Sequence, residues 1–440
     1  MIKKKALLIN PGYNNGIWNE MYPTGALTQL ASITIEMGWD VEVIQCVTDR
    51  VSHEGVVEWV KSEQPDIIGI SLTTFQTKPT KELSRMLKQV TSVPIVAGGV
   101  HISSIKDQAL VDFPDVDYFV DGEAESLWCV FLGVGVWGER RIIKGTTPNL
   151  NLCPFPDYSQ INTKRYFGAS PPGETPSMFM MASRGCPFLC SFCSKAVFGA
   201  TVRYKKPEYV IQELKHLKDQ GYKEVFFQDD TLNMNRAWLE EVLDRIISAK
   251  LDMKFRCPFR ANEKLVDVSL LQKMKKAGFW LIFYGVESGN QEMLDKMGKG
   301  LKIEEIERAF QLTKGEGIKI EASFIIGLMG DTPDTVQETY KFYRKLDPFW
   351  AGFSIAMPFP GTRYYNEVKE AGYLLETDFD KYTPERCIIR NETLSRDTII
   401  ETRNSISKEV QKRNFAHLVT CPTTLKWSAK KAKALYGGKG

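Results

Sequence analysis

Short apolar runs alternate with segments of helical periodicity along most of this 440-residue chain, and no other feature restricts its possible folds as strongly. Over residues 1–138 the predicted strands are Ala6–Asn10, Val41–Ile44, Asp66–Ser71, Pro94–Gly99 and Asp117–Val120. Helical patterns such as Gly25–Met37 and Lys78–Val90 separate them. Strands that alternate with helices form a parallel sheet with helices on both faces. The first 138 residues are therefore expected to form a Rossmann-like α/β domain.

A second alternating series follows residues 139–177, where prolines and glycines interrupt the periodicity and which we interpret as a linker. Six strand–helix units occupy residues 178–362, with strands predicted over Met178–Met181, Glu224–Gln228, Lys254–Cys257, Leu281–Val286, Lys319–Ile326 and Gly352–Pro358. Such a series predicts a parallel sheet that curls into a partial (β/α)6 barrel of the TIM type. Residues 363–440 are expected to form a small mixed C-terminal region that caps the barrel and contacts the substrate.

The charge of the chain is nearly balanced, with 57 Lys and Arg against 54 Asp and Glu and a net charge of +3. This balance gives no electrostatic reason to expect a nucleic-acid partner. No apolar run approaches the roughly 20 residues of a membrane-spanning helix, and the N-terminal run lacks the pattern of a signal peptide. An odd number of cysteines, 9, argues against a disulfide framework. These features predict a cytoplasmic protein without a transmembrane segment.

The turns after the strands of the first domain supply candidate ligand contacts. Open parallel sheets bind ligands at the carboxyl ends of their strands, where the strand order reverses. Glycines and hydroxyl groups at such positions suit the close approach of a large ligand to the backbone. The candidates are Pro11, Gly12, Ser71, Thr73, Thr74, Gly98, Gly99 and His101.

Three of the cysteines, Cys186, Cys190 and Cys193, lie within one loop directly after the first strand of the second domain. Three thiolates so near to one another in the sequence can surround one metal centre. A structural zinc site would usually be closed by a fourth Cys or His at similar spacing, and none lies nearby. The triplet therefore favours a cubane iron–sulfur cluster with one iron left open, and zinc is the weaker alternative.

The spacing Cys-x3-Cys-x2-Cys, with the aromatic Phe192 before the last cysteine, resembles the signature of the radical S-adenosylmethionine (SAM) superfamily. The resemblance implies a [4Fe–4S] cluster on Cys186, Cys190 and Cys193, with the methionine part of SAM on the open iron. It also implies that an electron from the reduced cluster cleaves SAM to a 5′-deoxyadenosyl radical, which abstracts a hydrogen atom from the substrate.

Three later segments resemble the SAM contacts of the same superfamily. Asp229 and Asp230 end the second barrel strand, where the family contacts the SAM amino group. A segment similar to the family's GxESG motif contributes Glu287 and Ser288. Gly327 belongs to a glycine motif that the family places beside adenine. A helix cap is the alternative role for the aspartates, and a buried structural carboxylate is the alternative for Glu287.

The first domain is similar to the cobalamin-binding domain that precedes one branch of radical SAM enzymes, and this resemblance adds Glu123 to the implied cofactor contacts. The Asp-x-His-x-x-Gly signature that supplies a histidine to cobalt is absent. The branch commonly holds cobalamin without such a histidine. His101 is therefore expected to form a hydrogen bond within its loop, with cobalt ligation as the weaker alternative. The alternative is a degenerate domain that binds no cobalamin and serves only packing or substrate recognition.

Together the resemblances imply a cobalamin-dependent radical SAM methyltransferase that acts on an unactivated carbon. One SAM molecule would methylate cob(I)alamin, and a second would supply the radical that activates the substrate. The alternatives are an oxidoreductase or cyclase of the same architecture, to which the anaerobic porphyrin-ester cyclases belong, and a non-catalytic cobalamin or iron–sulfur sensor. A methylthiotransferase would need more cysteines in its N-terminal domain than Cys46 and Cys129.

The substrate is left open among small molecules, lipids, tetrapyrroles and peptides, and no catalytic side chain is assigned. A ferredoxin or flavodoxin is the expected electron donor. We expect it to dock on a basic patch near the cluster, which the sequence does not locate.

Overall fold

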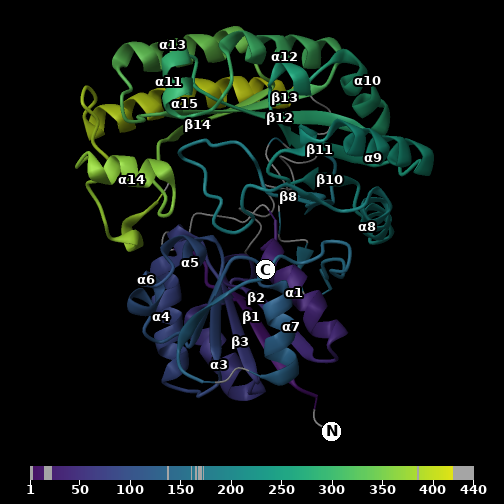
Figure 1. The fold of residues 1–440 in the computed structure, drawn as a ribbon, viewed down its shortest axis with the longest axis vertical. Coiled ribbons are helices and arrows are strands. Elements are labelled where there is room, and N and C mark those ends of the chain that lie inside the picture. Colours follow the sequence, from purple (N-terminus) through teal and green to yellow (C-terminus); the bar gives the residue numbers. More distant parts are fainter. Residues whose placement is uncertain are drawn as a thin grey trace.

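Two parallel sheets, each of six strands, organise the described part of the chain into two lobes (Figure 1). This computed structural model describes residues 3–13, 22–135, 138–159, 161–163, 166, 171, 173–383 and 386–419. The N-terminal lobe, drawn in purple and blue, holds the first sheet, and the teal-to-yellow lobe holds the second. The predicted α/β class, a Rossmann-like sheet followed by a partial barrel, is confirmed.

The first sheet has the strand order β2-β1-β3-β4-β5-β6, and its described strand pairs are all parallel. Its strands are β1 (Lys5–Asn10), β2 (Asp40–Gln45), β3 (Ile67–Ser71), β4 (Ile95–Gly98), β5 (Tyr118–Asp121) and β6 (Arg141–Lys144). The order reverses between β1 and β3. The loops after these two strands therefore flank the crevice in which sheets of this kind bind ligands.

Helices cover both faces of the first sheet, because successive side chains of each strand point to opposite faces. Leu8 packs with α1 and α7 on one face, whereas Leu7 packs with α3 and α4 on the other. Burial of each such side chain contributes about 1.5–3 kcal/mol. The helices are α1 (Gly25–Glu36), α2 (Cys46–Asp49), α3 (His53–Glu63), α4 (Thr77–Lys88), α5 (Val100–Ile105), α6 (Gln108–Asp112) and α7 (Glu125–Val134).

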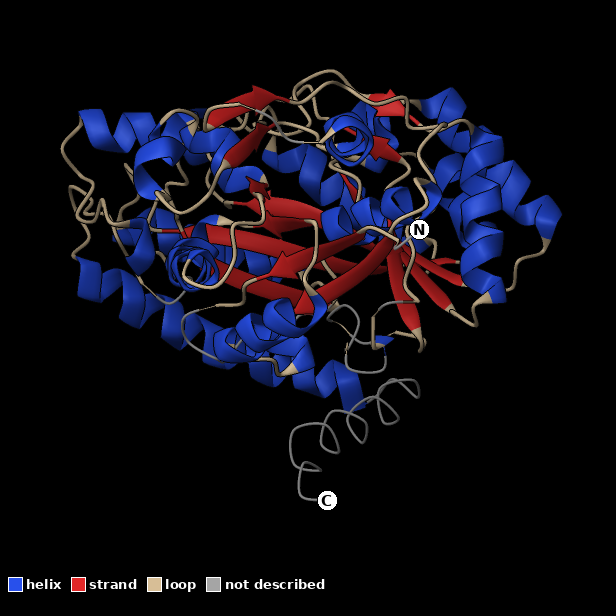
Figure 2. Cartoon of the chain, turned by 90° about the horizontal axis from the view of Figure 1, so that it is seen from below, coloured by secondary structure: helices blue, strands red, loops and turns tan. Residues whose placement is uncertain are grey.

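The second sheet is an open half-barrel of parallel strands in the order β14-β13-β12-β11-β10-β7. Its strands are β7 (Ser177–Met180), β10 (Glu224–Phe227), β11 (Lys254–Phe259), β12 (Phe279–Glu287), β13 (Lys319–Ile326) and β14 (Trp350–Ile355). Each overlaps one of the six strands predicted from the sequence. Figure 2 shows the long strands in the middle of the molecule, with helices on either side of them.

The outer layer of the half-barrel consists of amphipathic helices. In α9 the buried side chains Leu239, Val242, Leu243 and Ile246 recur at helical spacing and face the strands. The helices of this layer are α8 (Pro207–Asp219), α9 (Arg236–Ala249), α10 (Val268–Ala277), α11 (Gln291–Lys296), α12 (Ile303–Gly315) and α13 (Pro333–Leu346).

Three short strands were not predicted from the sequence. β6 lies in the segment interpreted as a linker and extends the first sheet through parallel pairing with β5. β8 (Ser183–Arg184) and β9 (Arg203–Tyr204) form an antiparallel pair next to the cysteine triplet. β8 and β9 have only two residues each, too few to show any periodicity, and β6 has only Ile142 and Ile143 between two charged residues. The predicted domain boundaries themselves stay a prediction.

The C-terminal region contains α14 (Arg363–Glu370) and the long α15 (Arg396–Val419). α15 runs beside β14, where the Asn414 side chain accepts from the N–H of Ala351 (3.1 Å) and donates to its carbonyl (2.9 Å). This helix therefore adds to the outer layer beside the edge strand. Residues 420–440, with the last part of the predicted capping region, lie outside the described residues.

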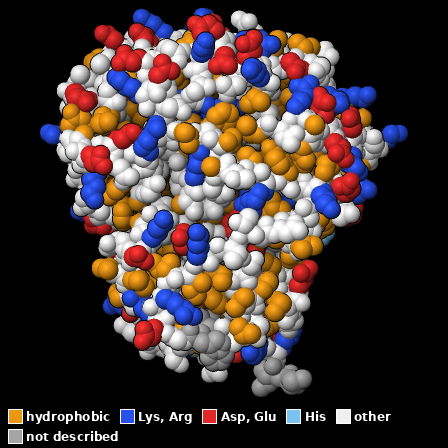
Figure 3. Space-filling model, viewed as in Figure 1, with side chains coloured by type: hydrophobic (Ala, Val, Ile, Leu, Met, Phe, Trp, Pro, Cys, Tyr) orange, Lys and Arg blue, Asp and Glu red, His pale blue; other side chains and the backbone are white. Residues whose placement is uncertain are grey.

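The molecular surface shows the near-neutral charge balance of the chain. Figure 3 shows basic and acidic side chains interspersed over this face of both lobes, without a large field of one sign. None of the helices in the described residues is long and apolar enough to cross a membrane.

Candidate functional site

The cysteine triplet lies on a loop, residues 185–202, that the β8–β9 pair closes at its base; we call it the cysteine loop. Gly185 begins it with φ +97°, and a Cβ there would lie 2.3 Å from the carbonyl oxygen of Thr201, so the position requires glycine. The N–H of Ser191 donates to the carbonyl of Met297 (2.8 Å), and that of Tyr364 donates to the carbonyl of Ser191 (2.9 Å). The loop is therefore anchored to the C-terminal end of α11 and to the first turn of α14.

Asp229 and Asp230 hold the start of the cysteine loop. Asp229 is buried and accepts hydrogen bonds from the N–H and hydroxyl of Ser183 and from the N–H of Ala182 (3.2 Å). Burial raises the pKa of Asp229 to about 6, although these bonds oppose the shift. Asp230 accepts from the N–H of Gly185 (2.8 Å). The structure thus gives both aspartates a structural role, and their contact with SAM stays a prediction.

The three thiols lie close enough to influence one another electrostatically. Desolvation and then the neighbouring Cys190 and Cys186 raise the pKa of Cys193 to about 11, even though part of its side chain reaches the surface. No three His, Cys, Asp or Glu side chains in the described ranges are arranged to hold a single metal ion.

Glu287 ends β12 at an irregularity in the ladder with β13, where its φ is +68°. Lys299 donates to one carboxylate oxygen (2.9 Å), and the hydroxyl of Ser323 donates to the other (3.3 Å). The hydroxyl of Ser288 instead meets that of Thr339 on α13 (3.1 Å). Glu287 therefore lies at the barrel mouth, as predicted, whereas Ser288 points into the outer layer.

Gly327 begins a tight turn, residues 327–331, that we call the glycine loop. Its φ is +79°, and its N–H donates to Asp331 (2.8 Å). A Cβ on Gly327 would lie 2.8 Å from the side chain of Ile399 on α15. Asn391 donates to the carbonyl of Leu328 (2.6 Å), so the segment before α15 also holds this loop.

The candidate residues of the first domain gather at the β1/β3 end of the sheet. Gly12 has φ +86°, and its N–H donates to the side chain of Asn10 (3.1 Å). Gln76 donates to the same oxygen (2.5 Å) and accepts from the N–H of Thr73 (2.8 Å). The remaining loop candidates, Pro11, Ser71, Gly98 and Gly99, end or directly follow β1, β3 and β4. These loops therefore meet at the point where the strand order reverses.

Two other candidates have partners within the protein. The imidazole of His101 is fully buried, its Nδ1 lies 3.1 Å from the hydroxyl of Thr74, and Phe379 packs edge-on against its ring. Glu123 pairs with Arg184 (2.5 Å) and Arg203 (2.6 Å), which flank the cysteine loop. His101 was expected to form a hydrogen bond within its own loop, but its partner Thr74 lies in the loop after the neighbouring strand β3. Glu123 joins the two lobes.

One cavity of about 810 Å³ is shared by the two lobes. Cys190 and Cys193 line one side, and the segments after β5 and β6, including Gly122 and Gly145, line the other. A second cavity of about 290 Å³ lies between Gly99 and Gly122 of the first domain and Met180, Met181 and Gln228 of the barrel. The carboxyl ends of β5 and β6 therefore face the cysteine loop.

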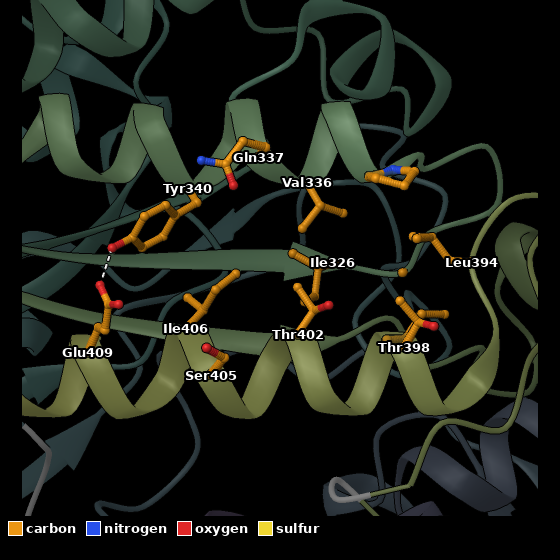
Figure 4. A pocket seen from close by; sticks show the side chains of 13 residues that line it. Ile326, Val336, Gln337, Tyr340, Leu394, Thr398, Thr402, Ser405, Ile406 and Glu409 are labelled. Atoms are coloured by element: carbon orange, nitrogen blue, oxygen red, sulfur yellow. Dashed lines mark hydrogen bonds between the residues drawn. The ribbon is translucent and has the colours of Figure 1, made fainter.

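A cavity of about 410 Å³ lies outside the barrel, between α13 and α15 (Figure 4). Val336 and Tyr340 of α13 face Thr402 and Ile406 of α15 across it, and Tyr340 donates a hydrogen bond to Glu409. Ile326 of β13 points into it, so it lies on the opposite face of the strand from Ser323. This cavity is separate from the one beside the cysteines.

Several residues at the site were missed from the sequence, among them Arg184, Arg203, Arg260 and Lys299. Single arginines and lysines carry no spacing signal. The one available hint was position, because residues at the carboxyl ends of barrel strands face the site, and Arg260 directly follows β11.

The two halves of the chain match two known domain families. The family model described as the B12 binding domain matches residues 18–130, and that of the radical SAM superfamily matches residues 180–343. An uncharacterized methyltransferase of Pyrococcus horikoshii is 30% identical over 402 residues, which cover 86% of this chain and 86% of the relative. The chain belongs to the radical SAM superfamily, in the branch with an N-terminal B12-binding domain. The predicted membership, and with it the prediction of an enzyme, is confirmed.

Two further similarities cover most of the chain. The anaerobic magnesium-protoporphyrin IX monomethyl ester cyclase of Rubrivivax gelatinosus is 28% identical over 425 residues, 90% of this chain and 75% of the cyclase. The cobalamin-dependent SAM radical enzyme OxsB, solved with aqua-cobalamin and SAM bound, has a TM-score of 0.72 at 17% identity. That match covers 99% of this chain and 72% of the OxsB chain. At this identity the likeness establishes the common fold of both domains.

Proposed function

We propose that this protein is a cobalamin-dependent radical SAM methyltransferase that methylates an unactivated carbon. The observation that carries the proposal is the cavity of about 810 Å³ that Cys190 and Cys193 share with the carboxyl ends of β5 and β6 in the first sheet. Two reactive groups cooperate on one substrate only when they are held next to each other. The methyltransferase among the relatives supports methyl transfer as the outcome.

The chain offers a thiolate for each of three irons of a cluster. Cys186, Cys190 and Cys193 would hold it, while Asp229 and Asp230 fix the backbone from which the cysteine loop starts. When bound, the cluster and SAM supply a carbon-centred radical, and cobalamin supplies the methyl group. The protein's own part is to hold the two groups next to each other.

SAM would lie along the mouth of the barrel. Glu287 would accept hydrogen bonds from its ribose or its amino group, since a carboxylate favours hydroxyls and an ammonium. Lys299, already bonded to Glu287, fixes the orientation of that carboxylate. The backbone of the glycine loop would border the adenine, with Asp331 holding Gly327 in its turn.

Cobalamin would occupy the crevice at the β1/β3 end of the first sheet. The backbone around Gly12, Thr73 and Gly99 would border it, and the amides of Asn10 and Gln76 hold the first two of these loops. We leave His101 out of this site because its ring is fully buried and bonded to Thr74.

An oxidoreductase or cyclase reaction is the second candidate, favoured by the similarity to the Rubrivivax gelatinosus cyclase. Both candidates would use the same cofactors and the same cavity. They differ in their products: methyl transfer yields S-adenosylhomocysteine and a product heavier by one methyl group, whereas cyclisation yields neither.

The substrate would be a small molecule, and a tetrapyrrole is the kind that the cyclase relative supports. A ferredoxin or flavodoxin would deliver electrons. Lys106, Lys144 and Arg363 line the cavity beside Cys190, together with Asp121 and Glu123, and these three basic side chains are where an acidic donor protein would dock. All eight cysteines in the described residues are free, which fits the cytoplasmic location that we expect.

Anaerobic reconstitution of the full chain with iron, sulfide and hydroxocobalamin tests the proposal. With SAM and a strong reductant, 5′-deoxyadenosine should form only when the cluster is present, and S-adenosylhomocysteine only when cobalamin is also present. Cys190→Ala should abolish 5′-deoxyadenosine formation. Cys129→Ala, which removes a partly exposed thiol outside the triplet, should not.

The outcomes separate the candidate functions. 5′-Deoxyadenosine without cobalamin-dependent S-adenosylhomocysteine would favour the oxidoreductase or cyclase. A bound cluster with no SAM cleavage at all would favour a sensor. It would refute both the methyltransferase and the oxidoreductase or cyclase.

A further inference from the structure

Arg260 directly follows β11 and lies against the cysteine loop. Its side chain is 7% exposed. The central carbon of its guanidinium lies 3.4 Å from the centroid of the Phe188 ring. Phe188 lies in the sequence between the first two cysteines of the triplet. Stacking of this kind fixes the plane of the guanidinium relative to the loop.

The contacts of Arg260 aim its charge at one cysteine. Its Nη1 donates to the Sγ of Cys190 (3.8 Å), and its Nε donates to the side chain of Asn262 (2.7 Å). Asn233 fixes its backbone, because its side chain accepts from the Arg260 N–H (3.0 Å) and donates to the Arg260 carbonyl (3.0 Å). The side chain is thus held at both ends.

The charge of Arg260 has no carboxylate partner among the described residues. Its Nη2 is buried without any hydrogen-bond partner. The other buried arginines differ, since Arg256 pairs with Glu224 (2.5 Å) and Arg184 with Glu123. A buried, uncompensated cation costs several kcal/mol, so the site of Arg260 is built for an anion that only the assembled enzyme contains.

We propose that Arg260 is a positioning residue that sets the reduction potential of the cluster on Cys186, Cys190 and Cys193. A cluster held by three thiolates gains a negative charge when it is reduced. A nearby cation, and a hydrogen bond to one of its thiolates, stabilise the reduced form and raise the potential. Arg260 therefore makes electron delivery to the cluster easier. This inference rests on the cluster of the proposed function but not on methyl transfer.

A packing role for Arg260 is the competing explanation. The guanidinium plane covers Phe188, and its loss would leave a gap beside the cysteine loop. Such a role predicts lower cluster content or stability, with no change in the potential of the clusters that do form. The reduction potential therefore distinguishes the two explanations.

The test is a potentiometric titration of the reconstituted full chain, followed by the electron paramagnetic resonance signal of the reduced cluster. Three variants are compared with the wild type: Arg260→Gln, Arg260→Lys and the control Arg245→Gln. Arg245 is a surface residue of α9 that pairs with Glu208 and Glu241. Iron content and circular dichroism are measured on each sample, so that loss of cluster or fold is seen separately.

We expect a lower midpoint potential in Arg260→Gln, a smaller decrease in Arg260→Lys, which keeps the charge without the fork of donors, and no change in Arg245→Gln. An Arg260→Gln protein with full iron content and an unchanged potential would overturn the proposal. If Arg260→Gln holds no cluster, the lysine variant decides in the same way. A wild-type protein that assembles no [4Fe–4S] cluster would instead refute the proposed function.

Discussion

His101 lies at the carboxyl end of the first sheet, but its side chain packs in the protein interior. It follows β4 directly, yet its ring is enclosed by Phe113, Phe379 and the Thr74 hydroxyl. Desolvation, and then repulsion from Lys81, lower its pKa to about 3. The imidazole is therefore neutral in the folded protein at ordinary pH, whereas in the unfolded chain it titrates near its usual value of about 6.5.

This difference predicts acid sensitivity. Because the folded pKa is depressed, the stabilising contribution is complete above about pH 6.5 and is lost as the pH falls toward 3. Between pH 6.5 and pH 5 the loss should be about 2 kcal/mol, at about 1.4 kcal/mol per pH unit. In urea unfolding, His101→Phe should therefore show a smaller decrease in the transition midpoint between pH 7 and pH 5 than the wild type. His216→Gln, at a more exposed position, is the control, and equal decreases in wild type and His101→Phe would contradict the prediction.

At the scale of elements, the segment before α15 acts as a clamp on the glycine loop. Asn391 donates to the carbonyl of Leu328 (2.6 Å), and Thr393 donates to that of Asp331 (2.7 Å). Ile399 on α15 packs against Gly327. A helix remote in sequence thus orders the turn that we place beside adenine.

Loss of the clamp should weaken SAM binding. Asn391→Ala removes the bond to Leu328, and a hydrogen bond worth about 1 kcal/mol corresponds to an increase of about fivefold in the dissociation constant. Calorimetric titration of the reconstituted protein with SAM measures this change. Asn366→Ala, on the exposed side of α14, should bind like the wild type. If Asn391→Ala also kept wild-type affinity, the clamp would serve stability alone.

The elements also show what a sequence can and cannot predict. β13 has the predicted bounds, Lys319–Ile326, because its outward residues are apolar and alternate with inward ones such as Ser323. β8 and β9 have two residues each, too few for any period to emerge. The cysteine spacing located the cluster loop because it is local. Arg184 and Arg260 act through contacts across the fold, and no local pattern marks them.

At the scale of the whole molecule, a buried ion-pair network ties the two lobes together. Arg184 pairs with Glu123 (2.5 Å) and Glu125 (2.6 Å), and Arg203 pairs with Glu123 (2.6 Å). All four side chains are largely buried. Removal of one partner from such a network leaves an unpaired charge in a poorly solvated site, which costs about 3–5 kcal/mol.

Arg184→Met should therefore destabilise the protein by about 3 kcal/mol in urea unfolding, because Glu125 loses its partner. Addition of Glu125→Gln should restore a large part of this loss, and a double-mutant cycle measures the coupling between the two positions. Arg85→Met on the exposed face of α4 should change stability by less than about 0.5 kcal/mol. Strictly additive effects of Arg184→Met and Glu125→Gln would show that the two side chains do not interact.

The ties between the lobes end on β8 and β9, the same two strands that close the cysteine loop. If the lobes move apart to admit a reactant or release a product, the ion pairs of Arg184 and Arg203 must either break or displace the β8–β9 hairpin. A relative movement of the two lobes would therefore also move the loop that carries the three thiols. Opening of the interface and the reactivity of the iron centre are thus coupled.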